Sequence, residues 1–250
     1  YWDMYKPADI DLADNPYMPE YGISFTDWNE LRRYGDILQK GDLSHKKARQ
    51  LIHGYYASVS FIDAQIGKIM QGLEKFGMDQ NTIIIVWGDH GWNLGEHGMW
   101  CKHTNYEIST RTAMMIKWPG VTTGKKTDAL AGLIDLYPTI CEMTNLPVPK
   151  HVEGSSLAPV LMNPDTSVNN AVFTRWYSSY SMRTDRYRFI IHDKPSKIYN
   201  AGKDTTGIYE IYDHKSDPQE NINIAYKPEN KNLLLELKKK MAKEGNLSFK

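Results

Sequence analysis

The sequence has little cysteine, no long apolar run and no excess of either charge. Its two cysteines, Cys101 and Cys141, show neither C-x-x-C nor Cys/His spacing, which excludes a disulfide scaffold and a cysteine zinc site. No stretch approaches the roughly 20 apolar residues that a transmembrane helix needs. Thirty basic and thirty acidic side chains give zero formal net charge. Total charge therefore does not indicate binding to nucleic acid or an anionic membrane, and an anionic ligand requires a local cationic cluster.

What is present is enough apolar material for a core and a clear helix-then-strand pattern. The chain has 250 residues and is 41% hydrophobic, which is typical of a globular protein. Apolar side chains recur at steps of three and four from Ala48 to Leu73, which predicts a long amphipathic helix capped by Ser44 and ended by Gly77. A strand over residues 82–87 follows after a short connection, so the pattern predicts an α/β sandwich.

After Thr82 this strand is apolar at every position, which is typical of a strand buried in the middle of a parallel sheet. Ligands of such sheets bind beyond the carboxyl ends of the strands, where Asp89 and His90 stand. Gly88 and Gly91 flank the pair and let the backbone approach a ligand closely. The competing interpretation is a simple turn in which the aspartate caps the next segment.

The second half of the chain predicts a different architecture. A strand over residues 113–118 precedes a helix for which Asp135 is the expected N-cap, in a structural role. Residues 145–165 are rich in proline and serine, so we expect a boundary there, with domains at 1–160 and 161–250. Short runs at 171–174, 187–191 and 208–212 predict an antiparallel sheet, and an amphipathic helix closes the chain.

Residues 89–106 hold three histidines, three glycines and one lysine, a density that packing explains poorly. Asp89, helped by His90, is a candidate metal ligand, and Lys102 is a candidate cation for an anionic oxygen. His97 and His103 are either substrate contacts or hydrogen-bonded loop histidines. Trp92 is either a platform for a sugar ring or loop packing.

Residues 88–102 (GDHGWNLGEHGMWCK) resemble the sulfatase family of the alkaline-phosphatase-like superfamily, most closely its iduronate-2-sulfatase-like branch. Four further stretches carry the resemblance: residues 56–63 (YASVSFID), 135–139 (DLYPT), 182–188 (MRTDRYR) and 212–221 (YDHKSDPQEN). Each short motif is weak alone, but together they span about residues 45 to 225. The resemblance implies a partial alkaline-phosphatase-like α/β/α sandwich followed by a small α+β subdomain.

The resemblance also implies roles for residues at matching positions. Asp89 and His90 would bind a divalent cation, usually Ca²⁺, with the aspartate as the safer assignment because calcium prefers oxygen. Lys102 would hold a sulfate oxygen. Arg183 and Asp185 lie in a stretch interpreted as a subdomain contact without a catalytic role.

Two family features have no match. Sulfatases use a formylglycine made in a C/S-x-P/A-S-R motif and an amino-terminal aspartate pair, and neither occurs here. The chain is thus expected to be the carboxyl-terminal part of a sulfatase, inactive alone, whose partner is the missing segment that carries the formylglycine.

For the complete enzyme, the resemblance implies a sulfated sugar or glycosaminoglycan uronic acid as substrate. It also implies a periplasmic, secreted or lysosomal-type location, with no nucleic-acid partner and no membrane span. Two alternatives stay open: a phosphomonoester, phosphodiester or phosphonate hydrolase of the same superfamily, and an inactive carbohydrate-binding remnant.

Overall fold

The computed structural model describes residues 1–22, 29–38, 40–41, 43–192 and 208–245. The chain divides into two compact units. The first comprises Tyr1–Met18, Asp27–Thr82 and Trp92–Lys102, and the second comprises Pro19–Thr26, Ile83–Gly91 and His103–Lys250. The domain boundary expected near residue 160 stays a prediction.

The first unit is built on one long helix, α2, which spans His45–Lys75. Ser44 caps it, because its hydroxyl oxygen accepts a hydrogen bond from the Lys47 N–H at 3.2 Å. The chain leaves the helix through Gly77, whose φ of +66° suits a residue without a side chain. The helix predicted from the three-and-four spacing is confirmed, including both of its end signals.

Only part of the apolar stripe on α2 is covered in the first unit. The side chains of Ala48, Ile52 and Ala57 are buried, whereas Ile62 and Ile69 are 55% and 65% exposed. The same sequence pattern therefore continues from a packed region onto an open surface. An apolar stripe of this kind on an exposed helix is typical of a surface that another chain segment covers.

Besides 3₁₀ turns, the described residues of the first unit form three further short elements. They are α1 (Asn29–Arg32), β2 (Asn93–Leu94) and β3 (Trp100–Cys101). Strands β2 and β3 form an antiparallel hairpin. Leu31 and Ile37 pack with Cys101 in a small core, so the hairpin is anchored on the α1 region.

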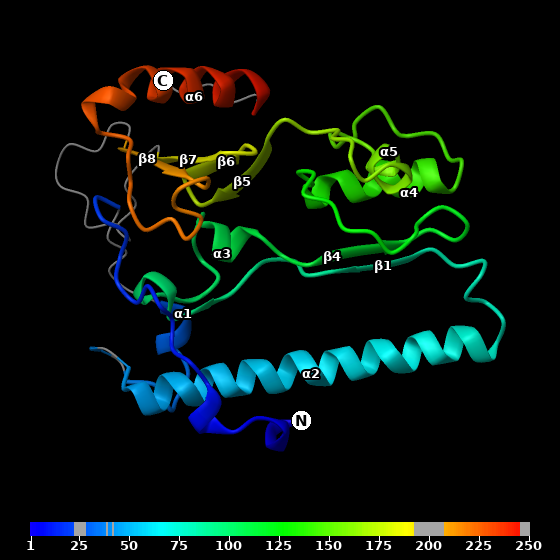
Figure 1. Ribbon diagram of the computed structural model, residues 1–250, viewed down its shortest axis with the longest axis horizontal. Coiled ribbons are helices and arrows are strands. Elements are labelled where there is room, and N and C mark those ends of the chain that lie inside the picture. Colours follow the sequence, from blue (N-terminus) through cyan, green and yellow to red (C-terminus); the bar gives the residue numbers. More distant parts are fainter. Residues whose placement is uncertain (23–28, 39, 42, 193–207, 246–250) are drawn as a thin grey trace. The chain divides into compact units, whose positions relative to one another are not determined.

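The second unit contains a four-stranded antiparallel sheet in the order β5-β6-β7-β8 (Figure 1). Its strands are β5 (Val172–Trp176), β6 (Ser179–Arg183), β7 (Tyr187–His192) and β8 (Ile208–Asp213). The three strands predicted from the sequence are confirmed. β6 was missed, because serine and tyrosine alternate with few β-branched residues in its sequence.

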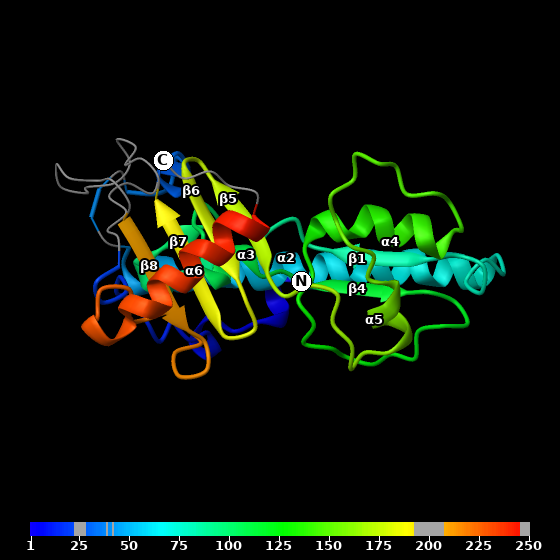
Figure 2. The same ribbon diagram turned by 90° about the horizontal axis from the view of Figure 1, so that it is seen from above.

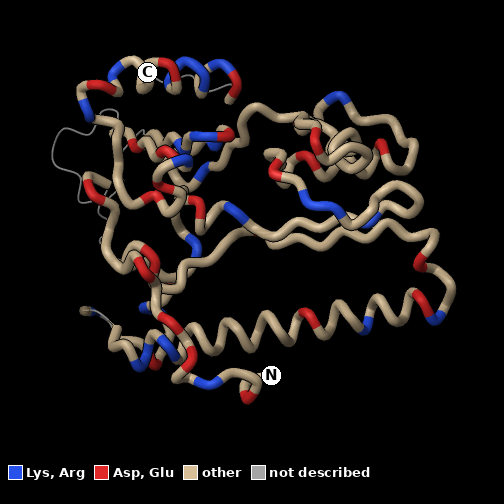
Figure 3. The backbone as a smooth tube through the Cα atoms, in the orientation of Figure 1, with Lys and Arg blue, Asp and Glu red and all other residues tan. Residues whose placement is uncertain are grey.

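The two faces of this sheet differ because successive strand residues point to opposite sides. Met182, Phe189 and Ile211 face α6 (Lys231–Glu244) and form a core with its Leu237 and Met241. Figures 1 and 2 show α6 lying across this face of the strands. Besides its apolar side, α6 carries several lysines and two glutamates, which is typical of a helix with a solvated outer surface (Figure 3). The terminal helix is therefore confirmed.

The opposite face of the sheet is polar and also buried. Arg188, His192 and Glu210 are no more than 3% exposed. Figure 1 shows the short helix α3 (Glu107–Thr110) on this side of the sheet. This polar face carries the ionic network described below.

Strand β1 (Ile84–Trp87) corrects one expectation. It pairs with β4 (Met114–Lys117) in antiparallel register, from Ile84 opposite Lys117 to Trp87 opposite Met114. In the described part of the chain the two form a separate two-stranded sheet, and Trp87 is 51% exposed. The prediction of a strand buried within a parallel sheet was wrong, because continuous apolarity fixes neither the direction nor the number of neighbouring strands.

Two helices follow β4, namely α4 (Leu136–Met143) and α5 (Ala158–Met162). Asp135 precedes α4 but does not cap it through its side chain. Its buried carboxylate instead accepts hydrogen bonds from the Gly132 N–H, the Ser155 N–H and the Asn169 amide, each at 2.8 Å. The expected structural role is confirmed, and Asp135 is the N-cap residue of α4 as predicted, but its carboxylate bridges three separate segments instead of bonding the first turn of the helix.

None of the helices in the described ranges combines the length and apolar character needed to cross a bilayer.

Candidate functional site

Asp89 and His90 follow β1 directly in the second unit. The Asp89 side chain is 83% exposed, and its Oδ2 lies 3.4 Å from Nε2 of His90. Nδ1 of His90 lies 2.9 Å from the Gly91 carbonyl oxygen, which orients the ring. The open carboxylate supplies one oxygen of the type that Ca²⁺ prefers, so this donor fits a cation as a single ligand within a larger set.

The two glycines around this pair have a definite steric role. A Cβ at Gly91 would lie 2.0 Å from the Ile108 carbonyl oxygen, and one at Gly88 would lie 2.1 Å from the Thr112 hydroxyl. The Gly91 N–H also donates to the Ser109 carbonyl at 2.8 Å. The glycines thus permit close backbone approach, as expected, but the approached partner is the chain's own 108–112 segment.

Lys102 ends the matching motif and lies in the first unit. Its Nζ is 3.0 Å from Glu30 Oε1, and it lies 5.2 Å from the centroid of the Trp92 ring. The hydrogen bond to Glu30 raises the pKa of Lys102 above its usual value, although burial opposes this shift. The lysine is therefore a fixed cation at neutral pH, with a carboxylate on one side and an aromatic face on the other.

Trp92 and His97 belong to the same hairpin region as Lys102. Trp92 stacks against Tyr55, with ring centroids 6.3 Å apart. His97 is buried and has a positive φ of 54°. Its backbone N–H donates a hydrogen bond to the Asn15 carbonyl oxygen at 2.6 Å. The predicted long polar loop therefore contains ordered structure with buried polar groups.

His103 lies in the second unit, where its ring stacks on Trp176 of β5 with centroids 5.9 Å apart. The structure thus pairs Asp89 with His90 in one unit and Trp92 with Lys102 in the other. The roles assigned to these residues, and to His97 and His103, stay predictions.

Sequence reasoning missed an ionic network on the polar face of the sheet. Arg188 Nε donates to Glu220 Oε1 at 2.6 Å, its Nη1 donates to Ser181 Oγ at 2.6 Å, and its Nη2 contacts Glu107. The Glu107 N–H donates to Glu220 Oε2 at 2.7 Å. A buried arginine with three partners from separate segments joins β7 to α3 and to the loop after β8. The sequence held one signal for this network. In a strand over residues 187–192 successive side chains point to opposite faces, so Arg188 lies on the face away from Phe189 and the apolar core.

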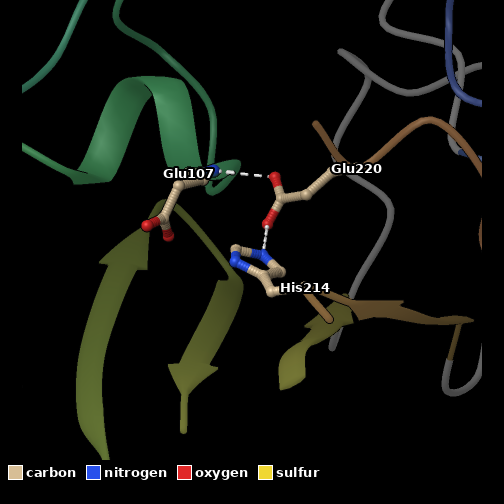
Figure 4. A group of neighbouring side chains, drawn as sticks. All are labelled: Glu107, His214 and Glu220. Atoms are coloured by element: carbon tan, nitrogen blue, oxygen red, sulfur yellow. Dashed lines mark hydrogen bonds and ion pairs between the residues drawn. The ribbon is translucent and has the colours of Figure 1, made fainter. Parts of the chain in front are cut away.

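Two glutamates of this network, together with His214, have the composition of a cation site. Arginines already neutralise the glutamates. Ligand atoms of Glu107, His214 and Glu220 lie within 4.8 Å of one another. Figure 4 shows Glu220 held between the Glu107 N–H and the ring of His214, which is 2.8 Å away. Burial disfavours ionisation of Glu107, but the charges of Arg188 and Arg183 outweigh it and lower its pKa. The arginines therefore already supply the positive charge that a metal ion would bring to these carboxylates.

A second buried group lies beside this network. The Tyr106 hydroxyl donates to Glu210 Oε2 at 2.9 Å, and the Tyr212 hydroxyl donates to the same oxygen. His192 Nε2 lies 2.7 Å from the other oxygen of Glu210. Burial, together with the charge of Glu210, raises the pKa of both tyrosines well above the usual value. Both tyrosines are therefore neutral donors to a buried carboxylate.

The comparisons with known proteins identify the class of this chain. The model of the family "Sulfatase" matches residues 12–146, and that of "N-sulphoglucosamine sulphohydrolase, C-terminal" matches residues 95–246. Each match covers more than half of the chain. The chain therefore belongs to the sulfatase family, within the alkaline-phosphatase-like superfamily, as the motif predicted.

Individual relatives agree with this assignment. The chain is 32% identical over 200 residues to an N-acetylglucosamine-6-O-sulfatase of Bacteroides thetaiotaomicron, covering 76% of this chain and 36% of the relative. It is 27% identical over 297 aligned positions to the iduronate 2-sulfatase of Mus musculus, covering 88% of this chain and 53% of the relative. The chain thus spans about half, or less, of the length of these relatives.

Solved structures support the fold. A structure in complex with its substrate D-glucosamine-2-N,6-O-disulfate aligns with a TM-score of 0.72 at 28% identity, covering 88% of this chain and 46% of that one. A phosphonate monoester hydrolase from Silicibacter pomeroyi aligns with a TM-score of 0.79 at 22% identity, covering 96% and 51%. The alkaline-phosphatase-like fold class with a C-terminal antiparallel sheet and helix is therefore confirmed.

Proposed function

We propose that this chain is the carboxyl-terminal portion of a sulfatase that hydrolyses sulfate esters on a sulfated sugar, with its nucleophile on a segment outside this sequence. The observation that carries the proposal is the pair of family matches, which together run from residue 12 to residue 246. The exposed apolar surfaces of α2 and, separately, of β1 and β4 support it. Ile69 of α2 is 65% exposed and Met115 of β4 is 59% exposed, and a further part of an α/β domain would cover such surfaces.

In this proposal Asp89 supplies an oxygen ligand to a divalent cation, Ca²⁺ by family resemblance, with His90 beside it. The cation would act as a Lewis acid that screens the charge of the sulfate ester. Lys102, fixed by Glu30 at 3.0 Å, holds an oxygen of the sulfate group and stabilises the negative charge that grows as the ester bond breaks. Trp92, His97 and His103 are the candidate substrate contacts.

The substrate and the location follow from the same resemblance. The relatives include enzymes named for iduronate and N-acetylglucosamine sulfates, so we assign a sulfated amino sugar or uronic acid to the complete enzyme. A periplasmic, secreted or lysosomal-type compartment matches such substrates. The formylglycine, which the family uses as nucleophile, would lie on the missing segment, so the isolated chain would be inactive.

The test uses the full-length protein that contains this chain. Lys102→Ala is expected to lower kcat/KM for a sulfate ester by about 100-fold or more, as removal of an oxyanion donor does. The matched control is Lys125→Ala, because Lys125 is an exposed lysine outside the motif. Equal activity of the two variants would remove Lys102 from the site.

Calcium titration tests the metal assignment separately. Asp89→Asn is expected to weaken Ca²⁺ binding, whereas Asp128→Asn, at another exposed aspartate, is expected to leave it unchanged. Faster turnover of a phosphonate monoester than of a sulfate ester by the unmodified protein would favour the alternative reaction, to which the fold of the Silicibacter enzyme points.

A further inference from the structure

A cavity of about 400 Å³ lies in the second unit beside the Arg188 network, and its wall is rich in cations. The charged residues of the wall are Arg111 after α3, Arg183 at the end of β6, Asp185 and Arg186 in the turn before β7, and Lys215 after β8, together with Glu107, which is already paired with Arg183 and Arg188. Four cationic side chains therefore meet at one cavity in a chain whose formal net charge is zero. A local excess of this kind is what an anionic ligand requires.

The four cations differ in whether a carboxylate of the described part of the chain engages them. Arg186 is paired with Asp213 through two hydrogen bonds, of 2.9 and 2.6 Å. Within the described ranges, by contrast, neither Arg111 nor Lys215 has a carboxylate partner within 4.0 Å. Both side chains are on exposed residues, so they can close around a ligand without loss of an internal ion pair.

Arg183 adds an unsatisfied donor at the same place. Its side chain is 17% exposed, and its Nε lies 3.3 Å from Glu107 Oε2 in an ion pair without hydrogen-bond geometry. Among the residues that the structure describes, the buried Nε and Nη1 of Arg183 find no hydrogen-bond partner. A buried donor without a partner is unfavourable, because it has lost its hydrogen bonds to water. Arg183 lines the cavity, and the planar donors of its guanidinium match the geometry of an oxyanion.

Besides the paired Glu107, the wall carries a second carboxylate, that of Asp185, which indicates the kind of ligand. In the described part of the chain Asp185 has no ion-pair partner within 4.0 Å, although it lies among cations. A carboxylate repels a bare polyanion but accepts hydrogen bonds from hydroxyl groups. Cations beside one free acceptor therefore suit a molecule that combines an anionic group with hydroxyls.

We propose that this cavity binds a sugar residue through its sulfate or carboxylate group, with Arg183, Arg111 and Lys215 on the anion and Asp185 on a hydroxyl. The choice of a sugar rests on the proposed function, and the cavity would hold a residue of the substrate other than the one that is hydrolysed. Arg183 and Asp185, expected to serve only a subdomain contact, would then be binding residues.

The experiment measures binding to the full-length protein by isothermal titration calorimetry. The probes are glucosamine 6-sulfate, glucuronate, unmodified glucosamine and inorganic sulfate, and the variant is Arg111→Ala/Lys215→Ala. This pair is exposed and leaves the internal network intact, so the fold is retained. A control with the same charge change, Lys125→Ala/Lys239→Ala, removes two exposed lysines elsewhere.

We expect the double variant to raise Kd for an anionic sugar by about tenfold or more, since two charge-assisted contacts are lost, while the control leaves Kd unchanged. Asp185→Asn should raise Kd for the anionic sugars but not Kd for inorganic sulfate. Comparison of the sulfated sugar with glucuronate identifies which anion the site prefers. Equal Kd for the double variant and its control, or sulfate binding as tight as either anionic sugar, would overturn the proposal.

A second measurement separates this proposal from the proposed function. Turnover of a small aryl sulfate, too short to reach a second site, should be unchanged in the Arg111→Ala/Lys215→Ala variant, while KM for a sulfated oligosaccharide rises. If the protein hydrolyses no sulfate ester but the variant still binds sugars more weakly, the proposed function fails and the binding site stands. If turnover is present and the variant changes neither KM nor Kd, the binding site fails alone.

Discussion

The buried arginine of the C-terminal sheet gives the sharpest prediction for stability. Arg188 is 3% exposed in its side chain and is bonded to Glu220, Glu107 and Ser181. Arg188→Met keeps much of the length and apolar stem but removes the charge. Glu220, with a side chain 1% exposed, would then lack its arginine partner. Breaking a buried ion pair from one side costs about 3–5 kcal/mol, because the remaining charge is left uncompensated.

The assay is urea unfolding followed by circular dichroism at pH 7, with the free energy of unfolding taken from the midpoint and slope. The matched control is Arg186→Met. Arg186 immediately precedes β7, and its side chain, paired with Asp213, is 53% exposed. Because solvent screens the exposed pair of Arg186 and Asp213, the decrease in the free energy of unfolding should be much smaller in this control than in Arg188→Met. If the two variants lose the same stability, the network does not carry the energy assigned to it.

A compensating variant tests the mechanism of the loss. Arg188→Met combined with Glu220→Gln removes both charges of the pair and should recover much of the stability lost by Arg188→Met alone. Failure to recover would mean that packing of the arginine stem, rather than the uncompensated carboxylate, sets the cost.

Two further predictions concern the loop and the tyrosines. In urea unfolding, Gly91→Ala should lower the free energy of unfolding by at least about 1–3 kcal/mol, because the new Cβ would lie 2.0 Å from a backbone oxygen. The control is Gly67→Ala in α2, where no atom outside the neighbouring residues of the helix lies within 4 Å of the new Cβ, and this variant should be neutral or stabilising. Stability should fall as the pH rises above about 10, because the unfolded tyrosines then lose their protons while buried Tyr106 and Tyr212 keep theirs. Tyr106→Phe should reduce this alkaline loss between pH 9 and 11 and Tyr17→Phe, at a side chain 82% exposed, should not; an identical pH profile for both variants would contradict the assignment.

The sequence by itself determined most of the local elements, although not β6, and it determined the family. The spacing from Ala48 to Leu73, with Ser44 and Gly77 at its ends, defined α2 because a helix needs only its own residues to present an apolar stripe and its own caps to end. Residues 88–102 carried the resemblance that the family models then matched. The apolar runs at 171–174, 187–191 and 208–212 likewise predicted strands of the C-terminal sheet, since the side-chain pattern of a strand depends only on its own residues.

Only the tertiary structure decided which segments meet. The apolar residues 82–87 did not reveal that β1 pairs antiparallel with β4, because a strand's neighbours are chosen by distant residues. Asp135 bonds Ser155 and Asn169, and Arg188 bonds Glu107 and Glu220, across separations of 20 to 81 residues. A buried charge is stable only beside its partner, and the chain's path through space, rather than its local pattern, supplies that partner.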